Sequence, residues 1–536
     1  MLTMLRSRVG SAVVKRQVRC FGALTSKPYA FTARPWELRN TETVDGMDGM
    51  GSNIVIQTKQ GEIMRILPRT NDDINEEWIH DKTRFSYDGL KLQRLIGPLV
   101  RSTANNNAWD ETASNWRGAF KHIADVLEKK KSSGKFSMRA VVGPTADLYS
   151  ALALSDWVTK YADVDVETIG SRGGTAGADL SSQYRFNSGI DNLENSDFCL
   201  LVGTELQTEG TLLASRLRKR FLRDTLEVAS VGPPSPLSFP YTQCGLTAGT
   251  LVEIAEGRHP IAKKIAQAKN PSIIVGASTF EREDGDVLAG AINTIAELSG
   301  SVRQYDKDGN MTWNGVNVLH HNANDVGLLE LGRTVPFKKD GERPEVLYLM
   351  NVSADDLPVD FDQLIGDNTF VIVHNTHGDE LASRADVVLP GATYSEKSGV
   401  YVNFEGRVQH GNNATTPPVD AREDWKIIRA ISEVCGDDAR LLYDSEKEIH
   451  DRLEQLVPTV GNLDKIVPTT APEQLLGASE HKLTNNILAR GVVNCTPLRQ
   501  ALYDFHLDGN SIARSSGTMA KCSSDLKRSN FIEMSF

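Results

Sequence analysis

Residues 370–409, FVIVHNTHGDELASRADVVLPGATYSEKSGVYVNFEGRVQ, contain the pattern that decides the fold. An apolar run at 370–373 is dominated by β-branched residues and predicts a buried strand. A polar loop, a short helical pattern and a second apolar run at 387–389, ended by Pro390, follow it. This alternation is typical of a parallel α/β sheet, whose ligands bind beyond the strand ends.

The residues after Pro390 predict a dense polar loop. Gly399 and Gly406 allow tight backbone turns there. The residues alone leave two interpretations open: a ligand-binding loop, or a structural loop whose side chains hydrogen-bond to one another and to the backbone. The polar side chains concerned are Glu396, Lys397, Asn403, Glu405, Arg407 and Gln409.

The segment 385–409, ADVVLPGATYSEKSGVYVNFEGRVQ, resembles a region of the molybdopterin oxidoreductase superfamily. In that superfamily an Ala-Asp-Val-Val-Leu-Pro strand precedes a Glu-Lys-x-Gly-x-x-x-Asn-x-Glu-Gly-Arg loop. The resemblance implies Rossmann-like parallel-sheet domains and, in active relatives, a pterin cofactor.

Composition bounds the class of protein. The chain has 536 residues, of which 40% are hydrophobic and 24% charged, as in soluble globular proteins of two to four domains. No apolar run approaches the ~18–20 residues of a membrane-spanning helix. The six cysteines form no C-x-x-C pair, so neither a disulfide framework nor a thiolate-held metal site is indicated. A net charge of −11 argues against a nucleic-acid partner.

The amino-terminal residues depart from this acidic balance. The first 36 residues contain seven Lys and Arg and no acidic residue. Leu5, Val9, Val13 and Val14 can form one apolar face of a basic helix, which is typical of a mitochondrial transit peptide. We expect a presequence at 1–21, and a disordered basic tail is the alternative.

Residues 22–38 and 51–90 resemble a narrower branch, the largest iron–sulfur subunits of respiratory complex I. Two β-branched runs at 54–56 and 63–66, joined by Lys59-Gln60-Gly61, independently predict a β-hairpin. The resemblance implies that this hairpin belongs to a small domain that holds an iron–sulfur cluster in bacterial relatives.

At the four positions that match the cluster cysteines of those relatives, this chain has Asp45, Asp48, Ser52 and His80. Such clusters are held by thiolates. We therefore expect no cofactor in this chain and assign no catalytic, cofactor-binding or metal-binding residue. Binding of another metal by Asp45, Asp48 and His80 is the weaker alternative. The resemblance implies that the clusters lie on a cysteine-rich ferredoxin-like half, expected here as a separate chain; a truncated sequence is the alternative.

From residue 98 the pattern becomes α/β. Glu205, after Gly203-Thr204, stands where the superfamily has an uncharged residue beside the pterin diphosphate, and its charge is unfavourable there. Residues 211–223 predict a basic helix with a solvated or partner-facing surface, 171–177 a glycine-rich loop, and 332–343 a polar linker. Further strands are expected at 139–142, 198–202, 227–231, 272–275 and 346–350, and helices at 147–160, 287–298 and 424–434.

Together these patterns predict a presequence (1–21), a small β-rich domain with a degenerate cluster site (22–97), a molybdopterin-oxidoreductase-like α/β body (98–436) and a carboxyl-terminal region (437–536). The resemblance implies a core structural subunit of the matrix arm of complex I, NADH:ubiquinone oxidoreductase, without redox centres of its own. It would lie peripherally on the matrix side of the mitochondrial inner membrane, without a membrane span or nucleic acid. Its partners would include the NADH-binding flavoprotein module and other matrix-arm subunits.

Two alternatives remain for the function. One is an active molybdopterin-dependent oxidoreductase, and the other is a free nucleotide-binding protein of the matrix. If the complex I interpretation holds, the polar loop at 390–409 is an inherited cofactor frame in which Glu396, Asn403, Glu405 and Arg407 satisfy one another and the backbone.

Overall fold

The computed structural model describes most of the chain. The expected presequence at 1–21 and the glycine-rich loop at 171–177 lie outside the described residues. The described residues are 29–101, 108–134, 136–169, 180–223, 226–302, 304–305, 311–466, 496–498 and 510–533.

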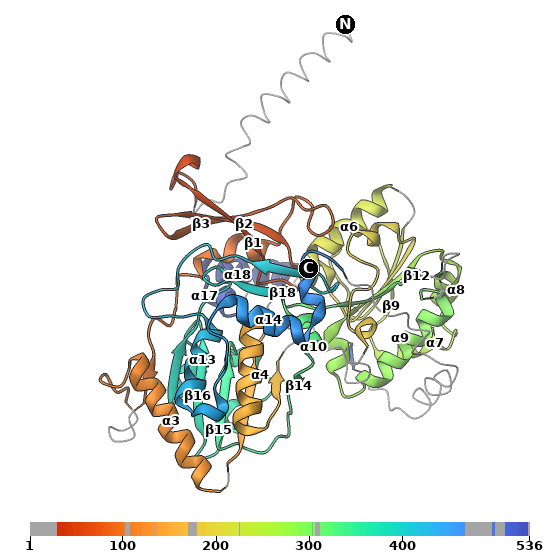
Figure 1. The fold of residues 1–536 in the computed structure, drawn as a ribbon. Helices are drawn as coiled ribbons and strands as arrows, with labels where there is room; N and C mark the ends of the chain where they lie inside the picture. The colour runs from red at the N-terminus through yellow and green to blue at the C-terminus, as the bar shows by residue number, and fades with distance from the viewer. Residues whose placement is uncertain are drawn as a thin grey trace.

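A seven-stranded sheet forms the centre of the larger lobe (Figure 1). All neighbouring strands are parallel except the edge pair β17–β4. The strands predicted at 139–142, 346–350, 370–373 and 387–389 are confirmed. In sheet order the strands are β14 (Thr334–Pro336), β6 (Val166–Thr168), β5 (Met138–Val142), β15 (Val346–Met350), β16 (Phe370–Asn375), β17 (Val387–Pro390) and β4 (Leu99–Val100).

Strand β14 lies inside the stretch that the sequence predicts to be a polar linker, so that prediction is wrong for its three residues. The strand is a short, partly exposed edge that pairs only with β6 among the described strands. An edge strand of this length has too few residues to show an apolar period.

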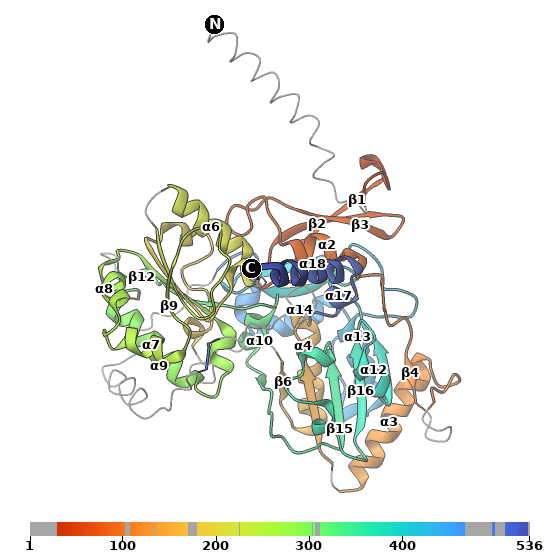
Figure 2. The same ribbon diagram turned by 180° about the vertical axis from the view of Figure 1, so that it is seen from behind.

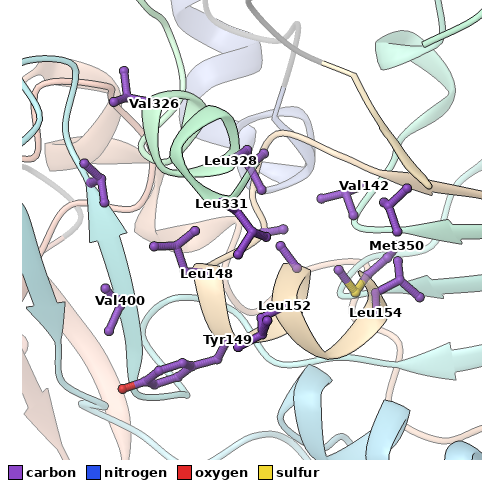
Figure 3. Close-up of a cluster of buried hydrophobic side chains, with 14 of the residues drawn as sticks. Val142, Leu148, Tyr149, Leu152, Leu154, Val326, Leu328, Leu331, Met350 and Val400 are labelled. Carbon is purple, nitrogen blue, oxygen red and sulfur yellow. The ribbon is translucent and has the colours of Figure 1, made fainter. Parts of the chain in front are cut away.

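Apolar side chains cover both faces of this sheet, as expected for parallel strands. On one face, α4 (Leu148–Ala162) is buried along most of its length and packs against α13 (Asp424–Val434). Figure 3 shows its Leu148, Leu152 and Leu154 among side chains from strand ends and from α10 (Asp325–Leu331). The helices α3 (Trp116–Ser132) and α14 (Glu446–Leu456) complete this face, and α11 (Phe361–Leu364) and α12 (Glu380–Arg384) lie on the other.

A five-stranded parallel sheet forms the second lobe, beside the first in Figure 1. It has its own apolar core, and the strands predicted at 198–202, 227–231 and 272–275 are confirmed. Its strand order is β13 (Val316–Leu319), β10 (Pro271–Gly276), β7 (Phe198–Val202), β8 (Glu227–Val231) and β9 (Thr242–Gly245). Its helices are α5 (Leu206–Glu209), α6 (Thr211–Arg223), α7 (Ala248–Ala255), α8 (Pro260–Gln267) and α9 (Gly285–Ser299), and a short ladder joins β11 (Gln304–Tyr305) to β12 (Met311–Trp313).

A three-stranded antiparallel sheet lies above the upper end of the larger lobe in Figures 1 and 2. Its strands are β1 (Arg39–Val44), β2 (Asn53–Lys59) and β3 (Glu62–Pro68). The predicted β2–β3 hairpin is confirmed, and its two-residue turn has φ of +53° at Gln60 and +83° at Gly61. Such a turn follows the right-handed twist of the strands. Strand β1, RNTETV, was not predicted because its residues show little apolar alternation.

The carboxyl-terminal helices pack beneath this small sheet. Ile512 of α17 (Ser511–Ser515) and Met519 of α18 (Gly517–Glu533) join the core formed by Ile54 and Ile56 of β2. A short helix, α2 (Asp81–Phe85), follows the hairpin. Within the described ranges, no helix combines the length and apolar character needed to cross a membrane.

The polar stretch after Pro390 begins as the loop that the sequence predicts, at 392–398, but from Gly399 it forms a β-hairpin that the sequence did not predict. β18 (Gly399–Val402) pairs with β19 (Val408–Gly411), and Gly406 in the connection has a φ of +86°. The hairpin is buried through Val400, Val402 and Val408. The sequence did not show the hairpin, because polar residues, most of which are buried as well, interrupt the apolar residues.

Candidate functional site

The candidate site lies where the central strands of the seven-stranded sheet end. The chain passes from β5 to β6 in one direction and from β15 to β16 and β17 in the other. The crevice between β5 and β15 is therefore the switch point at which α/β sheets bind ligands. Here a Cβ atom on Gly143, directly after β5, would lie 1.9 Å from the backbone oxygen of Asn351, directly after β15. The two loops are thus in backbone contact across the crevice.

A buried group of charges fills the space beside this contact. The ammonium of Lys397 lies 2.6 Å from Asp147 Oδ1 and also pairs with Asp424. Asp424 Oδ1 lies 3.0 Å from His374 Nε2, and His374 Nδ1 lies 2.9 Å from the Tyr348 hydroxyl. All five side chains are buried. The strand ends thus converge on a buried network of paired charges.

The network favours its ionised form. Burial alone lowers the pKa of Lys397, but the charges of Asp147 and Asp424 outweigh it and hold that pKa well above its ordinary value. Burial alone raises the pKa of Asp424, and Lys397 and His374 hold it well below its usual range. Neither group is therefore positioned to exchange a proton near neutral pH. Asp147 also caps α4 through Tyr149 N, at 3.2 Å.

Glu396 has a different partner from the one expected. Arg94, 302 positions earlier, donates two side-chain hydrogen bonds to its carboxylate, one of them at 2.6 Å. Glu396 also accepts a bond of 3.0 Å from the backbone of Thr393. The prediction that Glu396 pairs within its own loop is wrong for its side-chain partner, because the guanidinium arrives from the segment before β4.

Asn403, Glu405 and Arg407 contact one another as predicted. Arg407 Nε donates to Glu405 Oε1 at 2.8 Å, and the Arg407 backbone amide donates to Asn403 Oδ1 at 2.9 Å. Asn403 Nδ2 also donates to the backbone oxygen of Met50 at 3.0 Å. These residues therefore connect the β18–β19 hairpin to the small sheet.

The second sheet has a corresponding switch point between β7 and β10. A Cβ atom on Gly276 would lie 2.6 Å from the backbone oxygen of Gly203, so these strand ends are also in close contact. The Gly203-Thr204 loop turns inward onto Glu209. The Glu209 carboxylate accepts 2.8 Å and 3.0 Å bonds from the Thr204 hydroxyl and the Glu205 amide.

A short piece of the carboxyl-terminal region covers the same crevice. Leu498 is 3% exposed, joins the core of the five-stranded sheet, and lies 3.6 Å from the Cβ position of Gly203. Its backbone amide donates to the Leu246 oxygen at 3.0 Å, and Arg282 donates to the Pro497 oxygen at 2.8 Å. Residues 496–498 thus pack against the loop at this second switch point.

Helix α6 presents the predicted solvated basic surface only in part, because Arg218 and Arg223 are exposed whereas other basic residues of the helix face the rest of the chain. Arg216 is buried and donates to the backbone oxygens of Asp72 and Ile74 at 2.6 Å and 3.0 Å. Lys219 pairs with Glu194 at 2.6 Å and also with Glu76. The partners lie in other parts of the chain, so the helix sequence alone could not reveal them.

The four positions matched to cluster cysteines lie around the loop between β1 and β2. Asp45 is fully buried, accepts a 2.9 Å bond from Met47 N, and is bonded by Thr83. Asp48 accepts from Met50 N, and Ser52 is fully buried. His80 Nδ1 accepts from Lys82 N at 2.9 Å, and its Nε2 lies 3.2 Å from the Thr208 oxygen. Both nitrogens of His80 are therefore engaged by backbone.

Comparison with protein families identifies the body of the chain. Residues 94–434 match the model of the molybdopterin oxidoreductase family. The chain belongs to this family. Residues 38–88 match the NADH-ubiquinone oxidoreductase NDSU1/NuoG-like 4Fe-4S domain. In this molybdopterin oxidoreductase family member, an iron–sulfur-type domain therefore precedes the α/β body.

Curated relatives show the same branch of the family. The chain is 40% identical over 507 residues to NADH dehydrogenase [ubiquinone] iron-sulfur protein 1, mitochondrial, of Solanum tuberosum, covering 95% of this chain and 64% of that protein. It is 38% identical over 522 residues to the NADH-ubiquinone oxidoreductase 75 kDa subunit of Reclinomonas americana, covering 94% and 71%. It is 40% identical over 507 residues to the 78 kDa mitochondrial subunit of Candida albicans, covering 94% and 66%. The chain thus spans about two thirds of the length of these relatives.

These matches correct the expectation that this chain has no cofactor. A 4Fe-4S domain lies within the chain at 38–88, and a curated relative is named an iron–sulfur protein. The side chains at the four matched positions were tested against thiolate ligation and do not fit it. Asp45, Asp48 and Ser52 offer oxygen, and His80 is engaged through both nitrogens. These four side chains therefore do not provide the thiolate ligands of an iron–sulfur cluster.

The described part of the chain contains no group of three or more His, Cys, Asp or Glu side chains arranged to hold a metal ion. Its four cysteines, Cys199, Cys244, Cys435 and Cys522, are not paired in disulfides. Burial raises the pKa of the Cys199 thiol to about 12, which disfavours the reactive thiolate.

Proposed function

We propose that this chain is a core subunit of mitochondrial NADH:ubiquinone oxidoreductase, in which its α/β body acts as a scaffold. The proposal takes its enzyme and compartment from the names of the relatives. The chain would bind peripherally, on the matrix side of the inner membrane. Its role in electron transfer from NADH to ubiquinone would be to hold neighbouring subunits at constant separations.

The observation that supports this proposal is the close backbone packing at both switch points, within the residues that the structure describes. Gly143 meets Asn351 in one sheet, and Gly203 meets Gly276 beside Leu498 in the other. The charges next to the first crevice are mutually neutralised, with Lys397 between two carboxylates. An enzyme of this fold needs an open crevice and groups that can change their charge state. We therefore assign no catalytic or cofactor-binding residue to the α/β body.

The proposed partners are the other subunits of the matrix arm, including a cysteine-rich ferredoxin-like module and the NADH-binding flavoprotein module. The segment that precedes β1 supports docking there, because Phe31 and Trp36 are largely exposed. Deletion of residues 22–39 should release the cysteine-rich partner and leave the α/β body folded. Unchanged co-purification of that partner would contradict this assignment.

The proposed domain limits are 22–97, 98–436 and 437–536, after a presequence at 1–21. Limited proteolysis with mass spectrometry checks these limits. Stable fragments that end inside the seven-stranded sheet would contradict them.

Metal analysis of the purified complex distinguishes the proposed scaffold role from the alternative, an active molybdopterin enzyme. The chain should co-purify with NADH:ubiquinone oxidoreductase activity, and its depletion should remove that activity. Molybdenum and tungsten should remain well below one atom per chain. Stoichiometric molybdenum or tungsten, or full activity after depletion, would overturn the proposal.

A further inference from the structure

The loop between β1 and β2, residues 45–52, brings oxygen atoms together on one buried face. Val44 pairs with Asn53 at the end of the ladder, and the Asp45 amide then donates to the Ser52 oxygen at 2.9 Å. Opposed residues of an antiparallel pair place their side chains on the same face, with Cβ atoms about 4.5–5.5 Å apart. Asp45 and Ser52 are both fully buried. A carboxylate and a hydroxyl therefore face the same enclosed space.

Side chains without partners surround this space. The Ser52 hydroxyl has no hydrogen-bond partner within the described residues, and neither the amide oxygen nor the amide nitrogen of Gln409 has one. Gln409 is 1% exposed, and its amide oxygen lies 2.2 Å from the Cβ position of Gly51, next to Ser52. More than about nine in ten buried polar groups are paired in native proteins. Two such side chains at neighbouring positions indicate a bound species that they contact.

The charge of the loop is only partly compensated, because the buried Lys82 acts on Asp45 from a distance. Neither Asp45 nor Asp48 forms an ion pair with a side chain that the structure describes. Burial and the charge of Asp48 raise the pKa of Asp45 to about 7, and burial raises the pKa of Asp48 to about 6. Two buried carboxylates that lie near each other favour a cation bound between them.

We propose that Asp45, Asp48, Ser52 and the amide oxygen of Gln409 form a binding site for one hard divalent cation of the Mg²⁺, Ca²⁺ or Mn²⁺ class. Carboxylate, hydroxyl and amide oxygens are the ligands that such cations prefer, whereas thiolates select softer metals and iron–sulfur clusters. His80 is not a ligand, because backbone groups engage both of its nitrogens. The site adjoins the β18–β19 hairpin through Gln409, so the cation would join the small sheet to the body.

The remaining polar groups near the loop agree with this assignment. The Tyr394 ring lies against Gly46, and its hydroxyl has no partner among the described residues. Burial, together with the charge of Asp45, raises the Tyr394 pKa well above its ordinary value. The neutral hydroxyl can therefore complete the coordination directly or through water. The bound cation would also relieve the mutual repulsion of the Asp45 and Asp48 carboxylates.

The test is Mn²⁺ binding to the full chain, followed by electron paramagnetic resonance at pH 7.5. We expect one Mn²⁺ per chain, displaced by Ca²⁺ or Mg²⁺. Asp48→Asn and Ser52→Ala should each weaken binding by about tenfold or more. Asp72→Asn, which changes an exposed carboxylate in the same domain, is the matched control and should leave binding unchanged. Circular dichroism confirms that each variant is folded, and Ser52→Ala removes a ligand without changing charge.

Proton competition gives a second readout. Lowering the pH from 7.5 to 5.5 should weaken Mn²⁺ binding in the wild type, because the two carboxylates must lose their protons to bind a cation. The cation should also raise the unfolding temperature of the wild type and not that of Asp48→Asn. Absence of Mn²⁺ binding at millimolar concentration would overturn the proposal. Iron with acid-labile sulfide in the purified chain, lost in Asp48→Asn, would overturn it as well.

Discussion

Replacement of Lys397 by Met tests whether the buried charge network supports the fold. Met retains most of the side-chain volume and removes the ammonium that lies between Asp147 and Asp424. The carboxylates of Asp147 and Asp424 are then buried away from water. Within this network, His374 is the only remaining side chain that can compensate their negative charge. Removing one partner of a buried ion pair destabilises a protein by about 3–5 kcal/mol. We expect the loss of stability to lie near the upper end of this range, because the ammonium pairs with two carboxylates and not with one.

The loss should depend on pH with a definite sign. In the wild type, the depressed pKa of Asp424 contributes stability that is present above its unfolded pKa and is lost only as the pH falls through the lower folded value. In the variant, burial dominates and raises the folded pKa of Asp424 above its unfolded value. The destabilisation is then largest above that raised pKa and decreases as acid protonates the group. It should therefore be smaller at pH 5 than at pH 8.

Urea unfolding at both pH values, followed by circular dichroism and tryptophan fluorescence, measures the effect. Lys426→Met is the matched control, because Lys426 pairs with Glu423 at 2.7 Å on the surface of the same region. Its loss should be below about 1 kcal/mol at either pH. A loss below about 1 kcal/mol for Lys397→Met, or a larger loss at pH 5 than at pH 8, would refute the assignment of an ionised buried network.

Three further substitutions test the contacts that close the site. Arg94→Met should destabilise the fold by about 3–5 kcal/mol, since it leaves Glu396 buried without its cation; chemical unfolding measures the loss. Gly391→Ala should lower stability by about 1–3 kcal/mol, because the new Cβ would lie 2.3 Å from Asp424 Oδ1, and the change in unfolding midpoint reports it. Leu498→Ala should lower the stability of the five-stranded lobe by about 2–5 kcal/mol and raise its hydrogen exchange.

Each of these substitutions has a control in the same chain. Arg422→Met removes an exposed, 3.8 Å contact, and Gly97→Ala adds a Cβ with no atom within 4 Å. Leu463→Ala truncates a leucine that is 45% exposed. All three controls should change stability by less than about 0.5 kcal/mol. If a control lowered the stability as much as its test substitution, the contacts that close the site would not be the cause of the stability.

The elements with strong local patterns could be predicted from the sequence. Strands such as β7 and β15 are continuous apolar runs, and helices α6 and α13 begin and end at the predicted residues. Short or polar strands could not, and β1, β14 and the β18–β19 hairpin show why. Their positions depend on neighbouring strands more than on their own residues.

The site shows the same division between local and distant information. The sequence by itself determined which polar residues gather after β17 and that Asn403, Glu405 and Arg407 can bond to one another. Only the tertiary structure decided that Glu396 binds Arg94 and that Leu498 covers the second crevice. Hydrogen bonds between near neighbours follow from the spacing of residues along the chain. The partner of a buried charge depends instead on which distant segments packing brings together, and no local pattern encodes that.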